Sequence, residues 1–190
     1  MTNLSIIGTG NMGQAIASVA AKGGHSVQQL GQTDDTPISG DVVVLAVPYP
    51  AVADVIAKRG SQLAGKVVVD ITNPLDFETF DSLVVPADGS AAAEIAAALP
   101  DSQVLKAFNT TFAGTLAAGT VGPLTTTVLI AGDDTDAKST LAAVLTSGGL
   151  QAIDAGSLKR ARELEALGFL QLTLAANEKV SWTGGFAVIA

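Results

Sequence analysis

The sequence predicts an α/β fold of the Rossmann type, with a doubly wound, mostly parallel sheet, and three observations point to it. Short β-branched or aliphatic runs alternate with alanine-rich stretches of helical length, the pattern of parallel strands joined by crossover helices. The first run, Leu4–Ile7, leads directly into a glycine-rich hexapeptide. The run Val42–Val47 is nearly all apolar, as expected of a strand that is covered on both faces.

The first half of the chain is expected to form four strands and two helices. The strands are Leu4–Ile7, Val27–Leu30, Val42–Val47 and Val67–Ile71, and the helices are Met12–Ala21 and Ala51–Lys58. The Gly23-Gly24 pair ends the first helix, since glycine interrupts helical periodicity and tolerates the conformation after a helix end.

The second half continues the alternation and ends in one long helix. Helices are expected at Ser90–Leu99, with Ser90 as the N-cap, and at Asp134–Leu145, whose acidic first turn suits the helix dipole. Strands are expected at Val104–Ala107, Thr126–Ala131 and Ala152–Asp154, and the long helix at Leu158–Asn177.

Residues 1–190 read as one nucleotide-binding domain without a linker. The long helix carries apolar residues on more than one face, so it must be buried by more than its own sheet. Residues 157–190, the helix and tail, are therefore expected either at a homodimer interface or under an internal cover.

Composition excludes several classes of function. Ten Lys and Arg against eighteen Asp and Glu give a net charge of −8, which disfavours nucleic acid and anionic membranes as partners. The absence of cysteine and the single histidine, His25, argue against disulfides, cysteine nucleophiles and a metal site. No export signal or membrane-spanning run is visible after Met1, so a cytoplasmic location is expected.

The hexapeptide Gly8-Thr9-Gly10-Asn11-Met12-Gly13 has the spacing G-x-G-x-x-G between a predicted strand and a predicted helix. The first glycine allows the tight turn, the second lets a diphosphate approach the backbone, and the third allows close helix–sheet packing. The free N–H groups at the helix start attract phosphate even in an acidic protein. This context predicts dinucleotide binding.

The residues after the second strand bear on the choice of nicotinamide cofactor. An acidic residue there usually binds the ribose hydroxyls of NAD, but this chain has Leu30-Gly31-Gln32-Thr33. Thr9, Gln32 and Thr33 offer hydrogen bonds to a 2′-phosphate, which favours NADP(H) over the alternative, NAD(H). Asp34 or Asp35 would reverse that preference by folding back to the ribose.

Five stretches, taken together, resemble a known family. They are Ile7–Gly13, Ala46–Tyr49, Asp70–Pro74, Lys106–Thr110 and Asp154–Leu158, the last followed by Ala161-Arg162. They resemble the small NADP-linked oxidoreductases of the deazaflavin (coenzyme F420)-dependent NADP reductase family. They are also similar to the cytosolic reductase domain of the STEAP metalloreductases.

The resemblance implies NADP(H) as cofactor and a flavin or deazaflavin as second substrate. In such proteins the nicotinamide lies at the strand ends, beside loops like those after Val47, Ile71 and Ala107, and hydride passes directly between stacked rings. The chain departs from the family in two places. Only Gln32–Gly40 separate the second strand from Asp41, where the family usually has another helix and strand, so the sheet is trimmed there. The Ser-Arg pair that grips the 2′-phosphate is replaced by Gly31-Gln32.

The candidate site residues follow the carboxyl ends of strands, where open α/β sheets bind ligands. Cofactor binding is assigned to Gly8, Thr9, Gly10, Asn11, Met12, Gly13, Gly31, Gln32, Thr33, Ala46, Val47, Pro48, Tyr49, Thr72, Asn73 and Pro74. Substrate binding is assigned to Phe108, Asn109, Thr110 and Arg162. These are mostly flat walls and neutral hydrogen-bonding groups, which suit hydride transfer better than hydrolysis.

Several of these residues have an equally ordinary structural interpretation. Tyr49 either stacks on a cofactor ring or covers the core, and Asn73 and Asn109 either bind the nicotinamide or support turns. Arg162 either reaches an anionic substrate or pairs with Glu165 on the same helix. Lys106 is expected to be solvated, and Trp182 to belong to the core or an interface.

The sequence therefore predicts an NADP(H)-dependent oxidoreductase that transfers a hydride to or from a deazaflavin or flavin-like small molecule. A reductase of a small imine or keto acid is an alternative, although such enzymes usually carry a sizeable helical substrate domain. A non-catalytic sensor that binds NAD(P) is the alternative from a different class.

Overall fold

The computed structural model describes residues 1–31 and 33–189, so the predicted cofactor residue Gln32 lies outside the described residues. A seven-stranded sheet has the strand order β2-β1-β3-β4-β5-β8-β9. All neighbouring strands pair in parallel except β5 and β8, which are antiparallel. The predicted fold, a mostly parallel Rossmann-type sheet, is confirmed.

Each predicted strand and helix is present within a few residues of its expected bounds. The strands of the sheet are β1 (Asn3–Ile7), β2 (Ser26–Leu30), β3 (Val42–Leu45), β4 (Val67–Asp70), β5 (Gln103–Lys106), β8 (Thr127–Gly132) and β9 (Gln151–Gly156). The helices are α1 (Asn11–Lys22), α2 (Val52–Arg59), α3 (Ala91–Ala98), α4 (Ala113–Ala118), α5 (Thr135–Ser147) and α6 (Ala161–Ala176). Among the described strands and α-helices, three were not predicted, namely α4 and the small hairpin of β6 (Thr120–Val121) and β7 (Leu124–Thr125).

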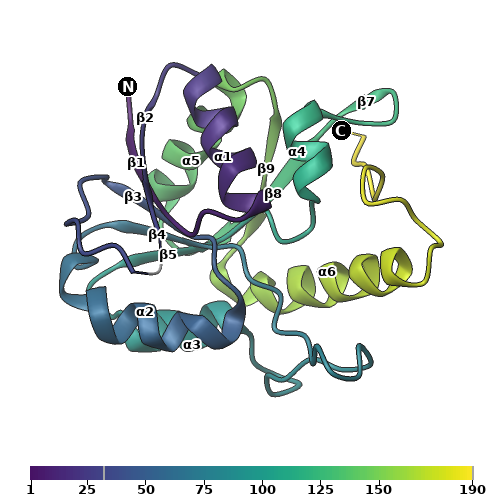
Figure 1. Cartoon of the computed structure of the whole chain (residues 1–190), viewed down its shortest axis with the longest axis horizontal. Helices are drawn as coiled ribbons and strands as arrows, with labels where there is room; N and C mark the ends of the chain where they lie inside the picture. Colours follow the sequence, from purple (N-terminus) through teal and green to yellow (C-terminus); the bar gives the residue numbers. More distant parts are fainter. Residues whose placement is uncertain (32, 190) are drawn as a thin grey trace.

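Helices cover both faces of the sheet, as Figure 1 shows, with α1 and α5 on one face and α2 and α3 on the other. Because successive strand residues point to opposite faces, β1 contributes to two cores. Ile6 packs with residues of α1 and α5, whereas Ile7 packs with residues of α2 and α3. Burial on both faces explains why β3 is wholly apolar.

The strand β2 lies at the edge of the sheet, and β1 lies between β2 and β3, which a short connection joins. The chain therefore leaves β1 toward one neighbour and later returns on its other side. Ligands of open α/β sheets bind at such a reversal of strand order, outside the carboxyl ends of the strands. That place is where the glycine-rich loop leaves β1.

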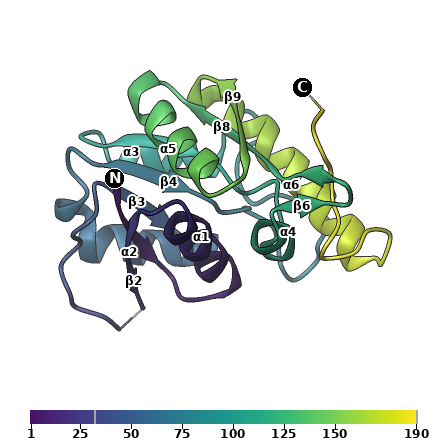
Figure 2. The same ribbon diagram turned by 90° about the horizontal axis from the view of Figure 1, so that it is seen from above.

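Helix α6 projects from the sheet, and the chain after it turns back toward α4 and the small hairpin (Figures 1 and 2). The helix packs through buried residues such as Leu164, Gly168 and Gln171, while the side chain of Leu170 on another face is 50% exposed. Trp182 of the tail packs on Phe112 at the start of α4, with ring centroids 5.0 Å apart. Within the described part of the chain, no helix combines the length and apolarity needed to cross a membrane.

Candidate active site

The loop between β1 and α1 has the geometry that its glycine spacing predicts. Gly8 has φ +125°, and a Cβ atom there would collide with the carbonyl oxygen of Ala46. A Cβ atom on Gly13 would collide with the carbonyl oxygen of Gly8. Gly10, by contrast, would place a Cβ in open space, with nothing within 4 Å. The first and third glycines are thus required by packing, and the second leaves the backbone accessible from outside.

Helix α1 begins with unsatisfied donors. Gly10 is its N-cap, no side chain caps it, and its first turn contains no acidic residue. The N–H groups of Asn11, Met12 and Gly13 have no intrahelical partner, since the first N–H groups of a helix never do. With the positive end of the helix dipole, these groups form a site for an anion.

A cavity of about 450 Å³ lies on one side of this loop. We call it the loop cavity. Its lining residues come from the glycine loop, the ends of β2 and β3, and α2; they are Ile7, Gly8, Thr9, Gly10, Gly31, Ala46, Val47, Pro48, Ala51, Asp54, Val55, Lys58 and Arg59. It has the size of ordinary small-molecule sites and opens beside the anion site.

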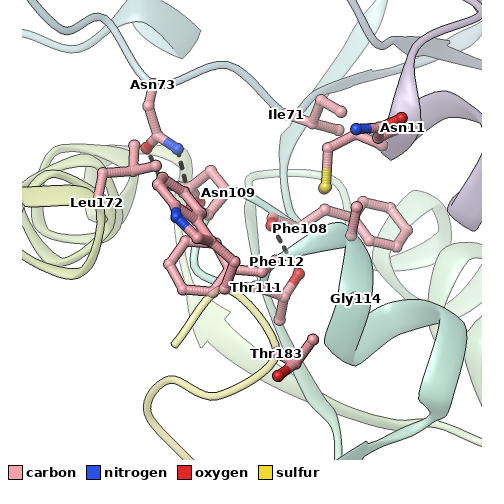
Figure 3. A pocket seen from close by; sticks show the side chains of 13 residues that line it. Asn11, Ile71, Asn73, Phe108, Asn109, Thr111, Phe112, Gly114, Leu172 and Thr183 are labelled. Atoms are coloured by element: carbon pink, nitrogen blue, oxygen red, sulfur yellow. Dashed lines mark hydrogen bonds between the residues drawn. The ribbon is translucent and has the colours of Figure 1, made fainter. Parts of the chain in front are cut away.

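A second cavity, of about 460 Å³, lies on the other side of the loop (Figure 3). We call it the tail cavity, because the C-terminal tail forms part of its wall. It is lined by Asn11, Met12, Ile71, Asn73, Phe108, Asn109, Thr111, Phe112, Ala113, Gly114, Leu172, Trp182 and Thr183. None of these described lining residues carries a charge, and four of them are aromatic or leucine side chains, Phe108, Phe112, Leu172 and Trp182.

Two asparagines in the tail cavity bind each other across the ends of β4 and β5. The Asn109 Nδ2 donates to Asn73 Oδ1 (3.0 Å) and to the carbonyl of Leu164 on α6 (2.8 Å), and Asn73 Nδ2 donates to the carbonyl of Asn109 (3.0 Å). Figure 3 shows the two amides facing each other. Gly168 of α6 makes room for them, since a Cβ there would collide with Asn73 Oδ1.

The Asn109 Oδ1 atom is buried and has no protein hydrogen-bond partner. A buried acceptor without a partner is costly, and this one belongs to a residue that lines the cavity. The neighbouring Phe108 has φ +64°, and its carbonyl accepts a hydrogen bond from Thr111 Oγ1 (2.7 Å). Strained backbone of this kind is concentrated at functional sites.

A buried cluster of charges lies beneath the loops that follow β4 and β5. The Lys106 ammonium donates to Asp70 Oδ2 (2.7 Å), Glu165 Oε1 (2.8 Å) and the carbonyl of Thr72 (2.6 Å), and the three charged side chains are at most 1% exposed. The expectation of a solvated Lys106 is therefore wrong. Burial raises the pKa of Glu165, and the nearby Lys106 charge opposes that rise. The cluster joins β4, β5 and α6 and holds the backbone of the loop at Thr72.

The structure gathers most of the predicted site residues around the two cavities. Gly8, Thr9, Gly10, Gly31, Ala46, Val47 and Pro48 line the loop cavity, and Asn11, Met12, Asn73, Phe108 and Asn109 line the tail cavity. Gly13 is buried beneath the loop.

Six other predicted residues line neither cavity. Tyr49 lies in a groove between α2 and α3, where its hydroxyl donates to Glu94, and the pKa of Tyr49 is raised by burial and by this carboxylate. Arg162 is exposed and pairs with Glu163 at 2.9 Å, because its expected partner Glu165 is buried against Lys106. Thr72, Pro74 and Thr110 are buried, and Thr33 is exposed.

Fourteen described lining residues of the two cavities were not assigned to the site from the sequence, and four of them bear most on ligand binding. Lys58 and Arg59 of α2 line the loop cavity, and Phe112 and Trp182 line the tail cavity. Trp182 is 53% exposed, so the expectation that it belongs to the core is wrong, and the alternative, a place at an interface, stays a prediction. The basic pair at the end of α2 was visible in the sequence, but its orientation toward the loop depends on the short connection after β2.

Comparison with known proteins agrees with this geometry. Residues 31–74 match the protein family described as coenzyme F420-dependent NADP oxidoreductase. The chain is 32% identical over 157 residues to the F420-dependent NADP reductase of Methanocaldococcus jannaschii, an alignment that covers 80% of this chain and 70% of the relative.

The chain belongs to the F420-dependent NADP reductase family. It is also 29% identical over 180 residues to the metalloreductase STEAP3 of Rattus norvegicus, covering 86% of this chain and 36% of that protein. A crystal structure from Arthrobacter sp. FB24, described as a candidate F420-dependent NADP-reductase, superposes over the whole of both chains with a TM-score of 0.86 at 24% identity. The family resemblance seen in the sequence motifs is confirmed, and with it the class of enzyme, an oxidoreductase.

Proposed function

We propose that this protein transfers a hydride between NADP(H) and a deazaflavin such as coenzyme F420, with FMN or another flavin as the alternative acceptor. One observation carries the proposal. Gly8, Thr9 and Gly10 line the loop cavity while the next two residues, Asn11 and Met12, line the tail cavity. A dinucleotide whose diphosphate binds at the start of α1 would therefore have one end in each cavity.

The residues present fit NADP(H) on several counts. The free N–H groups of Asn11, Met12 and Gly13 suit the diphosphate, and the open backbone at Gly10 lets it approach. The unpartnered Asn109 Oδ1 is an acceptor for the carboxamide N–H of a nicotinamide in the tail cavity. The buried cluster around Lys106 and the pairing of Asn73 with Asn109 would keep that acceptor in place.

The tail cavity has the walls that two stacked rings require. NADPH supplies a hydride from C4 of its nicotinamide, whose C–H electron pair goes to the acceptor ring, and the acceptor then takes a proton from water. Such a reaction needs close juxtaposition of the rings more than an acid or base. Among the described residues, the lining is uncharged and includes the apolar walls Phe108, Phe112, Leu172 and Trp182, which supports that use.

The test is turnover with defined acceptors. NADPH oxidation is followed by its loss of near-ultraviolet absorbance while F420, FMN, FAD or a ferric chelate is supplied separately. We expect oxidation with F420, or with FMN, at one acceptor reduced per NADPH consumed. Firm NADPH binding without turnover on any acceptor would contradict the proposal and favour a non-catalytic sensor.

We further propose that the chain forms a homodimer through residues 157–190. Leu170 is 50% exposed, and Leu167 and Leu174, one turn before and one turn after it, are only partly covered; these three form an apolar helix face that a second copy would bury. Sedimentation equilibrium tests this, with twice the chain mass expected for the wild type and the chain mass for Leu170→Lys; a monomeric wild type would contradict it. The cytoplasmic location stays a prediction of the sequence.

A further inference from the structure

Among the described residues that follow β2, none places a side chain in the loop cavity that would distinguish NADP from NAD. Gly31 lines the cavity without a side chain. The two acids that follow are turned elsewhere. Asp34 Oδ1 accepts hydrogen bonds from the hydroxyl (2.8 Å) and the N–H (3.3 Å) of Thr36. The Asp35 Oδ1 atom lies 2.6 Å from the Lys58 Nζ and forms an ion pair with it, and the Asp35 side chain is 85% exposed.

Helix α2 supplies positive charge to the same cavity from its last turn. Arg59 is buried, and its guanidinium donates to the backbone carbonyls of Asp34 and Thr36. It thereby fixes the short connection between β2 and β3, and both of its terminal guanidinium nitrogens donate there. Lys58 is different, because its side chain is 45% exposed and its strongest contact is the exposed carboxylate of Asp35.

We propose that Lys58 binds the 2′-phosphate of NADP(H) and sets the preference for NADP over NAD in this chain. The role rests on the proposed function, and it replaces the Ser-Arg pair that the family resemblance implies after β2. A phosphate monoester carries nearly two negative charges at pH 7, whereas exposed lysine–carboxylate pairs are weak. The phosphate therefore displaces Asp35 from the ammonium.

Asp35 and Asp54 both oppose the phosphate. Asp54 also lines the loop cavity and lies four residues before Lys58 on α2, a spacing at which side chains on one helix face meet. Removing one of these acids should strengthen NADPH binding, because the ammonium then has one competitor fewer. Asp35 is the better choice, since it makes the observed ion pair.

The experiment measures NADPH and NADH affinities of the full chain by titration calorimetry. Lys58→Gln should weaken NADPH binding about tenfold or more, the effect of losing one hydrogen bond to a charged group, and should change NADH binding less than about twofold. Asp35→Asn should strengthen NADPH binding. Lys22→Gln is the matched control, because Lys22 lies at the opposite end of α1 from the glycine loop, and it should change neither affinity.

The outcomes separate this proposal from the proposed function. A Lys58→Gln variant that keeps the wild-type ratio of NADPH to NADH affinity overturns the role of Lys58, even if hydride transfer proceeds normally. A selective loss of NADPH affinity supports the role of Lys58, even if no acceptor is reduced. If the control Lys22→Gln weakens NADPH binding as much as Lys58→Gln does, the role of Lys58 is also overturned, since the loss then follows from the change in net charge.

Discussion

Substituting Gly10 by valine should separate cofactor binding from folding. Gly10 has φ −72° and ψ −177°, an extended conformation that valine adopts readily, and its added side chain meets nothing within 4 Å of Cβ. Replacing glycine at an N-cap by an apolar residue costs at most about 1 kcal/mol. For a chain of this size that lowers the melting temperature by about 2–4 °C.

The effect on binding should be much larger. A valine at Gly10 fills the space through which a diphosphate reaches the N–H groups of Asn11, Met12 and Gly13. Hydrogen bonds to charged groups contribute about 1.5–3 kcal/mol each, so losing two of them weakens NADPH binding about 10²- to 10⁴-fold.

Calorimetric titration with NADPH and a thermal melt of the same sample test both parts. Gly8→Val is the contrasting variant, because its φ of +125° and its collision with the Ala46 carbonyl should cost more than about 3 kcal/mol. Wild-type NADPH affinity in Gly10→Val would refute the assignment of the loop. Unfolding of Gly10→Val would refute the open space assigned to that position.

Three further variants test the tail cavity and its support. Trp182 is the chain's single tryptophan, and its fluorescence should fall when the acceptor binds. Trp182→Leu should raise the KM for the acceptor about tenfold and change the KM for NADPH little. Unquenched fluorescence at saturating acceptor would contradict this role of Trp182. Gly168→Ala forces Asn73 and Asn109 apart, so kcat/KM should fall about 10- to 100-fold, and wild-type kinetics would show that the pair has no part in the reaction. Glu165→Gln removes one partner of a buried ion pair and should lower the free energy of unfolding in urea by about 3 kcal/mol or more; a loss below about 1 kcal/mol would contradict a tightly coupled cluster.

Local rules were enough to predict most of the fold from the sequence. Ser90 was expected as a helix cap, and its side chain accepts the N–H of Ala93 (3.1 Å). Asp134 was expected at the start of its helix, where its side chain accepts the N–H of Ala137 (2.7 Å). The strand β3 was recognisable because both of its faces are buried. Helix α4 and the β6–β7 hairpin were missed because elements of six and two residues are too short to show a period.

The parts of the site that the sequence did not predict depend on contacts between distant segments. Lys106 looks solvated at the end of an isolated strand, and only the topology brings Asp70 and Glu165 to its ammonium. Trp182 reaches the tail cavity because the tail folds back to Phe112, a path that no local pattern specifies. The glycine loop was predictable because the G-x-G-x-x-G spacing between a strand and a helix is a local sequence pattern.

Direct hydride transfer is tested most decisively with NADPH that carries deuterium at both C4 positions. The deazaflavin is the better acceptor for this measurement, because its reduced ring carbon does not exchange hydrogen with water. Reaction in ordinary water should give one deuterium in each molecule of reduced deazaflavin, read by mass spectrometry. Reduced deazaflavin that contains only hydrogen from the solvent would contradict direct transfer between rings held together in the tail cavity.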